Sequence, residues 1–216
     1  TFALYGRALR AAGNPERADY AYRQSLLRTA GDPAVAAEYA EHIWMRRGDV
    51  AQADAVLDAA FHAGGPPAPL LLAKAMLYEA SGDGVRAADL LDAAVRSMPQ
   101  DTRVLMAAMD TALRLKRIDD AERYVRLAEA AQPQARAVIQ ASAILDLAQG
   151  RADVALRKLR GALASYPDDQ SLWGWAATAA RATGATLYAE LCDYESVVGV
   201  YDLATPPGWP NLETFL

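Results

Sequence analysis

The sequence predicts an all-α fold, a solenoid built from antiparallel helix pairs, and three columns of residues carry that prediction. Alanine recurs at positions 18, 53, 87, 121, 155 and 189, with spacings of 35, 34, 34, 34 and 34 residues. Five residues before these alanines stand glycines 13, 48, 82, 150 and 184, with Lys116 as the exception. Twelve residues after three of them stand Pro99, Pro133 and Pro167. A fixed period of this length is typical of stacked helical repeats.

The glycine column marks the turn inside each repeat, because glycine reaches the left-handed conformation that ends a helix at little cost. Asn14, Asp49 and Asp83 follow three of these glycines and are expected to cap the next helix. In the fourth turn Lys116 replaces the glycine, so this turn is predicted either to carry strain of about 1 kcal/mol or to close differently. The proline column stops the second helix of a repeat and resets the chain for the next one.

Between these breaks the apolar residues follow helical spacing, as in Leu71, Ala75 and Tyr78, then Ala87 and Leu91. Each repeat is therefore expected to hold two helices. The first helices are predicted near 1–12, 33–47, 68–81, 101–115, 135–149 and 169–183. The second helices are predicted near 15–29, 50–63, 84–97, 118–131, 152–165 and 186–198.

Charge and composition limit the classes of partner. The formal net charge is −5 and the pI is about 5.1, so neither nucleic acid nor an anionic membrane surface is an expected partner. The lone Cys192 has no internal disulfide partner, which favours an inert thiol in a reducing compartment. No signal peptide is evident, and no apolar run approaches the roughly 18 to 20 residues of a membrane span. We expect a cytoplasmic protein, although the first residue, Thr1, leaves open a removed targeting segment.

In this register the chain resembles the tetratricopeptide repeat (TPR). Repeat three carries the resemblance most fully, with Leu71, Ala75, Tyr78, Gly82, Ala87, Leu91, Ala94 and Pro99. The resemblance covers residues 1–198 as six repeats, near 1–31, 32–66, 67–100, 101–134, 135–168 and 169–198. It implies a right-handed superhelix that serves as a protein-interaction scaffold. Repeats five and six depart from the pattern, since Asp146 and Ala180 replace an aromatic residue.

In TPR proteins the first helices line the concave face, and fixed positions of the repeat point into it. The resemblance therefore implies a groove made by Glu38, His42, Met45, Arg46, Leu72, Met76, Glu79, Arg103, Met106, Asp110, Leu113, Arg114, Gln140, Ile144, Leu147, Ser171, Thr178 and Arg181. Tyr39 and Trp175 lie near its edge as candidate anchors, whereas Trp173 falls on a core position.

The middle of this predicted groove is apolar and methionine-rich, which favours a peptide or protein segment as the ligand. The alternative is that the same residues contact the neighbouring helix or a segment of the same protein. Arg46, Arg103, Arg114 and Arg181 would suit an acidic ligand, with solvated charge as the alternative. The carboxylate clamp of chaperone-binding TPR proteins is missing, because its positions hold Ala3, Glu38, Leu72, Met106, Gln140 and Gly174.

The sequence predicts no catalytic residue, metal site or cofactor within this chain. His42 and His62 fall on different predicted helices, outside any metal-binding spacing, so we expect ordinary polar side chains. Nucleophile-elbow, phosphate-loop and paired-cysteine motifs are absent from the sequence. Asp119-Asp120 and Asp168-Asp169 each stand at a predicted helix start, which favours capping over acid–base catalysis.

Residues 199–216 leave the repeat pattern as a proline-rich linker and the start of a truncated element. The run from Leu191 to Trp209 resembles the junction of bacterial proteins in which TPR repeats precede a 2-oxoglutarate and Fe(II)-dependent oxygenase domain. This implies an alternative function, the substrate-recruiting or regulatory half of an oxygenase whose catalytic domain lies beyond residue 216. Trp209 is expected to cover the last helix. A third interpretation is homo-oligomerisation through the terminal repeats or the groove.

Overall fold

A computed structural model describes residues 2–29, 31–63 and 67–198, and they form twelve helices and no strand. The helices are α1 (Phe2–Ala11), α2 (Pro15–Arg28), α3 (Pro33–Arg47), α4 (Val50–His62), α5 (Pro67–Ala80), α6 (Gly84–Ser97), α7 (Thr102–Arg114), α8 (Ile118–Ala131), α9 (Arg136–Ala148), α10 (Ala152–Ser165), α11 (Gln170–Thr183) and α12 (Thr186–Val198). Each helix begins and ends within about one residue of the predicted position. The all-α prediction is therefore confirmed.

The chain divides into two compact units, Thr1–Leu115 with α1 to α7 and Lys116–Leu216 with α8 to α12. The boundary falls in the turn of repeat four, where Lys116 interrupts the glycine column. The two helices of that repeat, α7 and α8, thus belong to different units.

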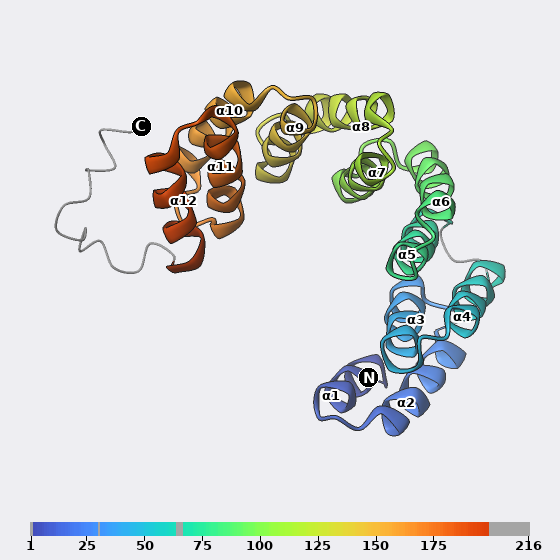
Figure 1. Cartoon of the computed structure of the whole chain (residues 1–216). Helices are drawn as coiled ribbons and strands as arrows, with labels where there is room; N and C mark the ends of the chain where they lie inside the picture. Colours follow the sequence, from blue (N-terminus) through green and yellow to red (C-terminus); the bar gives the residue numbers. More distant parts are fainter. Residues whose placement is uncertain (1, 30, 64–66, 199–216) are drawn as a thin grey trace. The chain divides into compact units, whose positions relative to one another are not determined.

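In the unit Thr1–Leu115 the helices form two layers. Helices α1, α3, α5 and α7 follow one another along one side, and α2, α4 and α6 lie along the other (Figure 1). Each helix of the second layer packs against the helices that precede and follow it in the chain. We call the two sides of this unit the first-helix face and the second-helix face.

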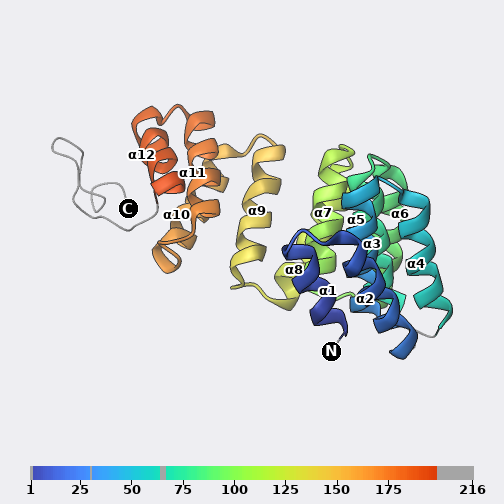
Figure 2. The same ribbon diagram turned by 90° about the horizontal axis from the view of Figure 1, so that it is seen from below.

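The unit Lys116–Leu216 repeats this pairing. Its helix α9 contacts α8, α10 and α11, while α11 also packs against α10 and α12. Figure 2 shows α9 standing beside α10 and α11 from a second direction.

The alanine column forms the narrowest part of the helix packing. Ala18, Ala53, Ala87, Ala121 and Ala155 have no exposed surface. The small methyl group of alanine lets the axes of two helices come close together. Larger side chains fill the space around the alanines, and those that are less than 2% exposed include Tyr22, Leu57, Leu91 and Leu159. The period seen in the sequence is thus a packing period.

The glycine column holds the left-handed backbone that the sequence predicts. Its φ angles lie between 64° at Gly48 and 88° at Gly82. Lys116 adopts the same conformation, with a φ of 59°. Among the described residues it is the one non-glycine residue with a positive φ. Of the two alternatives for the fourth turn, the strained one is therefore correct.

Helix caps follow the prediction at some turns and contradict it at others. Asp49 accepts a hydrogen bond from the Gln52 backbone N–H at 2.8 Å, and Asp83 and Asp169 cap α6 and α11 in the same way. Asn14 occupies the N-cap of α2 but makes no capping bond with its side chain, so that prediction was wrong.

The acidic pair Asp119-Asp120 does not cap α8 either. Arg117 holds the N-cap position, and both aspartates lie in the first turn, where negative charge complements the helix dipole. Asp120 also forms ion pairs with Arg117 at 3.5 Å and Arg123 at 3.6 Å.

Asp146, which replaces an aromatic residue, is buried and joins α9 to α10. Arg151 Nε donates to its Oδ1 at 2.9 Å, and Lys158 Nζ lies 2.6 Å from its Oδ2. Lys158 also donates to Ser142 Oγ at 2.6 Å. Two cations therefore pair with a carboxylate that has only 4% of its side-chain surface exposed. Ala180 is buried in the apolar core of the same unit.

Candidate functional site

The polar candidates on the first-helix face link one repeat to the next. Arg7 Nε donates to Glu38 Oε2 at 2.7 Å, which ties α1 to α3. Arg10 and Glu41 form a second ion pair between α1 and α3, at 3.1 Å. On α5, Glu79 accepts a 2.7 Å hydrogen bond from Thr111 Oγ1 and pairs with Arg114.

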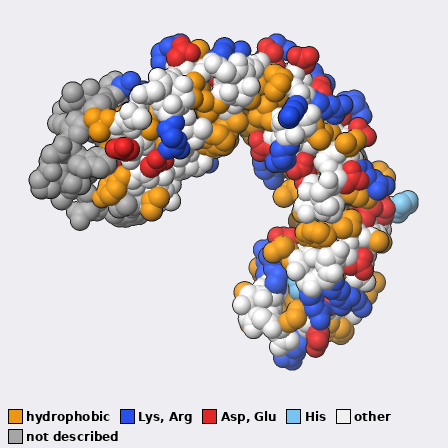
Figure 3. All heavy atoms as spheres, in the orientation of Figure 1, with side chains coloured by type: hydrophobic (Ala, Val, Ile, Leu, Met, Phe, Trp, Pro, Cys, Tyr) orange, Lys and Arg blue, Asp and Glu red, His pale blue; other side chains and the backbone are white. Residues whose placement is uncertain are grey.

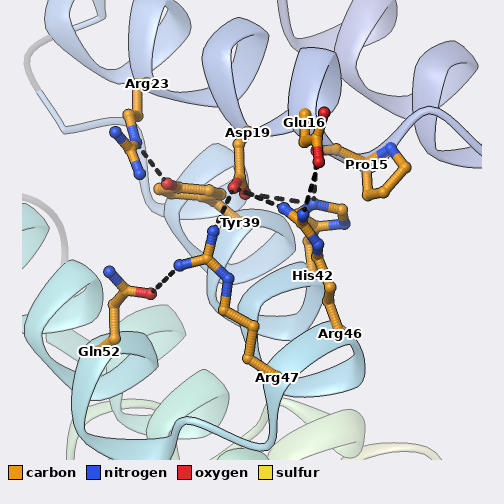
Figure 4. Close-up of polar contacts among 9 residues, drawn as sticks. All are labelled: Pro15, Glu16, Asp19, Arg23, Tyr39, His42, Arg46, Arg47 and Gln52. Carbon is orange, nitrogen blue, oxygen red and sulfur yellow. Dashed lines mark hydrogen bonds and ion pairs between the residues drawn. The ribbon is translucent and has the colours of Figure 1, made fainter.

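A buried carboxylate, Asp19, organises a second polar cluster between α2 and α3 (Figure 4). Arg46 and Arg47 each donate to its Oδ2 at 3.0 Å. His42 Nε2 lies 3.3 Å from both Asp19 Oδ1 and the Pro15 carbonyl oxygen. Because both neighbours are acceptors, Nε2 carries the proton and donates to them. His42 is only 3% exposed, so its ring serves this cluster and offers little surface to a ligand.

Tyr39, a predicted anchor, is also buried in the helix packing. Its ring stacks on Tyr22 with centroids 5.6 Å apart, and its hydroxyl accepts a 2.7 Å hydrogen bond from Arg23 Nε (Figure 4). Much of the polar set therefore contacts neighbouring helices.

Three hollows of about 350, 370 and 370 Å³ follow the first-helix face from α1 to α7. They adjoin one another, because the first two share Glu41 and Met45 and the last two share Met76 and Ala80. We call them together the first-helix groove. Its lining comprises Arg10, Ala37, Glu38, Ala40, Glu41, His42, Trp44, Met45, Arg46, Ala73, Ala75, Met76, Leu77, Glu79, Ala80, Leu91, Ala107, Asp110, Thr111 and Arg114.

Apolar side chains stand open in this groove. Met45 is 76% exposed and Met76 is 62% exposed. Figure 3 shows hydrophobic side chains over α3 and α5, with charged side chains on either side. Of the other candidates in this unit, Leu72 and Met106 are half-buried, and Arg103 pairs with Asp101 beside the start of α7.

Asp110 lies at the α7 end of the first-helix groove. It is accessible, but the surrounding wall displaces part of the water around its carboxyl, which raises its pKa. Nearby Arg114 lowers that pKa by less, and Glu79 raises it a little further.

Three polar candidates in the unit Lys116–Leu216, namely Gln140, Ser171 and Arg181, make helix-to-helix contacts. Gln140 Nε2 donates to Ser171 Oγ at 3.1 Å, and Arg181 pairs with Asp193 at 2.6 Å. Leu147 and Trp175 are half-buried against the apolar core. Ile144 is likewise half-buried, and Thr178 Oγ1 donates to the Gly174 carbonyl at 3.1 Å. Trp173 is buried, as expected, and its Nε1 donates to the Pro167 carbonyl at 2.7 Å.

A larger hollow of about 760 Å³, which the repeat pattern does not predict, opens on the second-helix face between α2 and α4. Its walls include Leu26, Leu27, Val56 and Ala60, with Leu27 78% exposed. The signal was present in the second helices, where Leu27 and Phe61 are apolar and exposed. We call this hollow the second-helix groove.

Neither a metal site nor a membrane span emerges from the described part of the chain. No three histidine, cysteine, aspartate or glutamate side chains there are grouped to hold a metal ion. No helix there has both the length and the apolar character needed to cross a membrane. The oxygenase junction and the packing of Trp209 depend on residues 199–216, which lie outside the described residues, and both stay predictions. Self-association stays a prediction as well.

Comparison with known proteins identifies the fold. No protein-family model and no curated protein matches the sequence. A tetratricopeptide repeat protein from Parabacteroides merdae matches with a TM-score of 0.70 and 15% identity, over 88% of this chain and 75% of that one. A thermophilic TPR protein from Thermus thermophilus gives 0.61 and 23%, over 82% and 96%. YrrB, a TPR protein with an unusual peptide-binding site, gives 0.55 and 15%, over 79% and 88%.

These likenesses confirm the tetratricopeptide-repeat fold that the alanine, glycine and proline columns predict.

Proposed function

We propose that this chain is a protein-interaction scaffold that binds an apolar segment of a partner protein in the first-helix groove. One observation carries the proposal: Met45 and Met76 join the three hollows and leave most of their own surface in water. Apolar side chains exposed along a row of adjoining hollows are typical of a surface that a partner covers.

The chemistry of the groove suits a protein segment. Methionine is unbranched and polarisable, so it adapts to differently shaped apolar side chains. Trp44 and Leu77 extend the apolar wall beside the two methionines. Covering one such side chain contributes roughly 1.5 to 3 kcal/mol when burial is complete, so the two methionines together contribute roughly 3 to 6 kcal/mol before the cost of association. A helical or extended segment with one apolar face meets these requirements.

Two glutamates beside the apolar wall stabilise the groove and are not needed as ligand contacts. Glu38 and Glu79 are paired with arginines of adjacent first helices, so they hold the groove walls together. YrrB, with the same fold, has a peptide-binding site, which is consistent with binding by this architecture.

The experiment selects peptides from a random phage-displayed library on the full chain and measures their affinities by fluorescence anisotropy. The double variant Met45→Glu/Met76→Glu should weaken binding at least about tenfold, because it places charge where apolar side chains are covered. Leu27→Glu is the matched control, since Leu27 is equally exposed but lines the second-helix groove. Circular dichroism checks that both variants keep their helices.

Two results would overturn the proposal. One is binding that survives the double variant, or no selected peptide that prefers the wild type to it. The other is binding lost with Leu27→Glu, which would move the interaction to the second-helix groove.

A further inference from the structure

The charges along the first-helix groove are almost all neutralised within the protein. Glu38 pairs with Arg7, Glu41 with Arg10, and Glu79 with Arg114. The remaining lining arginine, Arg46, pairs with Asp19 at 3.0 Å and with Glu16 at 3.5 Å. A ligand therefore meets little unpaired charge along most of the groove.

Asp110 is the exception in the part of the chain that the structure describes. No hydrogen bond or ion pair reaches its carboxylate there. The nearest cation, Arg114, donates to Glu79, and Thr111 Oγ1 donates to Glu79 as well. Both donors beside Asp110 are thus committed to another acid.

The position of this carboxylate joins it to the apolar wall. Asp110 lines the same hollow as Met76 and Ala80, and these two also line the next hollow toward α3. A segment that runs from Met45 over Met76 into the hollow beside α7 therefore passes Asp110. A carboxylate that has lost part of its hydration without gaining a partner is stabilised by an incoming cation more than a fully hydrated one is.

The candidate arginines carry no unpaired positive charge that would attract an acidic ligand. The sequence suggested Arg46, Arg103, Arg114 and Arg181 for that role, yet each one forms an ion pair with an acid of its own unit. The groove thus presents apolar surface and one carboxylate, Asp110, that has no ion pair among the described residues.

We propose that the segment bound in the first-helix groove carries a lysine or arginine that pairs with Asp110, beside apolar side chains that cover Met45 and Met76. This inference rests on the proposed function and names the charge of the partner. It reverses the sign that the arginines alone suggested.

The test compares peptides selected by the wild type with those selected by Asp110→Asn, which keeps the shape and removes the charge. Wild-type peptides should be enriched in a basic residue, Asp110→Asn peptides should lose that enrichment, and Asp110→Lys should favour acidic ones. Asp89→Asn, an exposed aspartate on α6, is the control and should leave the selection unchanged.

A double-mutant cycle then measures the pairing directly. Asp110→Asn should weaken the best basic peptide about five- to tenfold, as should changing its basic residue to norleucine. The two changes together should weaken binding no more than either one alone. Affinities that agree within about twofold for wild type and Asp110→Asn would overturn the inference, even where the methionine pair is still required. If the methionine pair is not required, or no peptide is selected, the proposed function fails and this inference falls with it.

Discussion

The turn of repeat four offers a direct test of how the repeats are held. Lys116 adopts a φ of 59°, where the other turns of this column have glycine. A left-handed conformation costs an L-residue about 1 to 2 kcal/mol, and glycine's larger loss of chain entropy offsets about 0.5 to 1 kcal/mol of that. Lys116→Gly should therefore raise the unfolding free energy by about 0.5 to 1 kcal/mol. For a chain of this length that corresponds to an increase in Tm of about 1 to 4 °C.

Glycine-to-alanine variants at other turns provide the reverse perturbation. At Gly82 and Gly150 an added Cβ would meet no atom within 4 Å, so only backbone strain opposes the change. Each should lose about 1 kcal/mol. At Gly31 the added Cβ would lie 2.9 Å from Ala63 Cβ, so Gly31→Ala should lose clearly more.

Urea unfolding followed by far-UV circular dichroism measures these differences, provided that the variants share one m-value. The expected order of stability is Lys116→Gly, wild type, then Gly82→Ala and Gly150→Ala together, and Gly31→Ala last. If Lys116→Gly were no more stable than the wild type while Gly82→Ala lost its expected amount, the left-handed strain at Lys116 would be refuted.

Three further predictions concern single side chains, each measured by the same unfolding assay. Asp146→Ala should lower the unfolding free energy by about 2 kcal/mol because it removes a buried, charge-paired acceptor, whereas exposed Asp153→Ala should leave it nearly unchanged. Asp101→Ala should cost about 1 kcal/mol at pH 7 by removing the cap of α7. A hydrogen bond from Arg103 lowers the pKa of Asp101, so its stabilisation is present above about pH 4 and the difference from Asp101→Ala should shrink as pH falls through that lowered pKa. Trp173→Phe should cost about 1 to 3 kcal/mol through a lost hydrogen bond and a small cavity, and equal stability would contradict its core role.

The helix boundaries were predictable because the signals that set them are local. A glycine at Gly48 or Gly82 determines the backbone of its own turn, whatever lies elsewhere in the chain. The caps were less predictable. Asn14 occupies an N-cap without a capping bond, because the residue type alone does not fix the side-chain rotamer. Arg117 holds the equivalent position of α8 but has no acceptor atom with which to cap the helix.

The roles of the groove residues were harder to predict because their partners lie on other helices. The sequence around Glu38 does not show that Arg7, one repeat earlier, is its partner, and only the fold, which brings α1 beside α3, reveals the pair. The period still offered a signal, since Glu79 and Arg114 are also opposite charges about one repeat apart. The second-helix groove left a weaker trace, because it depends on how closely Gly31, which follows α2, approaches Ala60 and Ala63 at the end of α4.

Some groove residues hold neighbouring helices together and others are free to contact a ligand, and this difference decides which substitutions report on binding. Replacing Glu38 or Arg114 removes an ion pair between neighbouring first helices, so weaker binding would not distinguish a lost ligand contact from a displaced groove wall. Met45, Met76 and Asp110 differ, because two are exposed apolar side chains and the third is a carboxylate with no ion pair among the described residues. Substitutions at these three positions should change affinity while leaving the unfolding free energy within about 0.5 kcal/mol of the wild type. Glu38→Ala should instead change the two together, and a variant that lost affinity at full stability would show that Glu38 contacts the ligand itself.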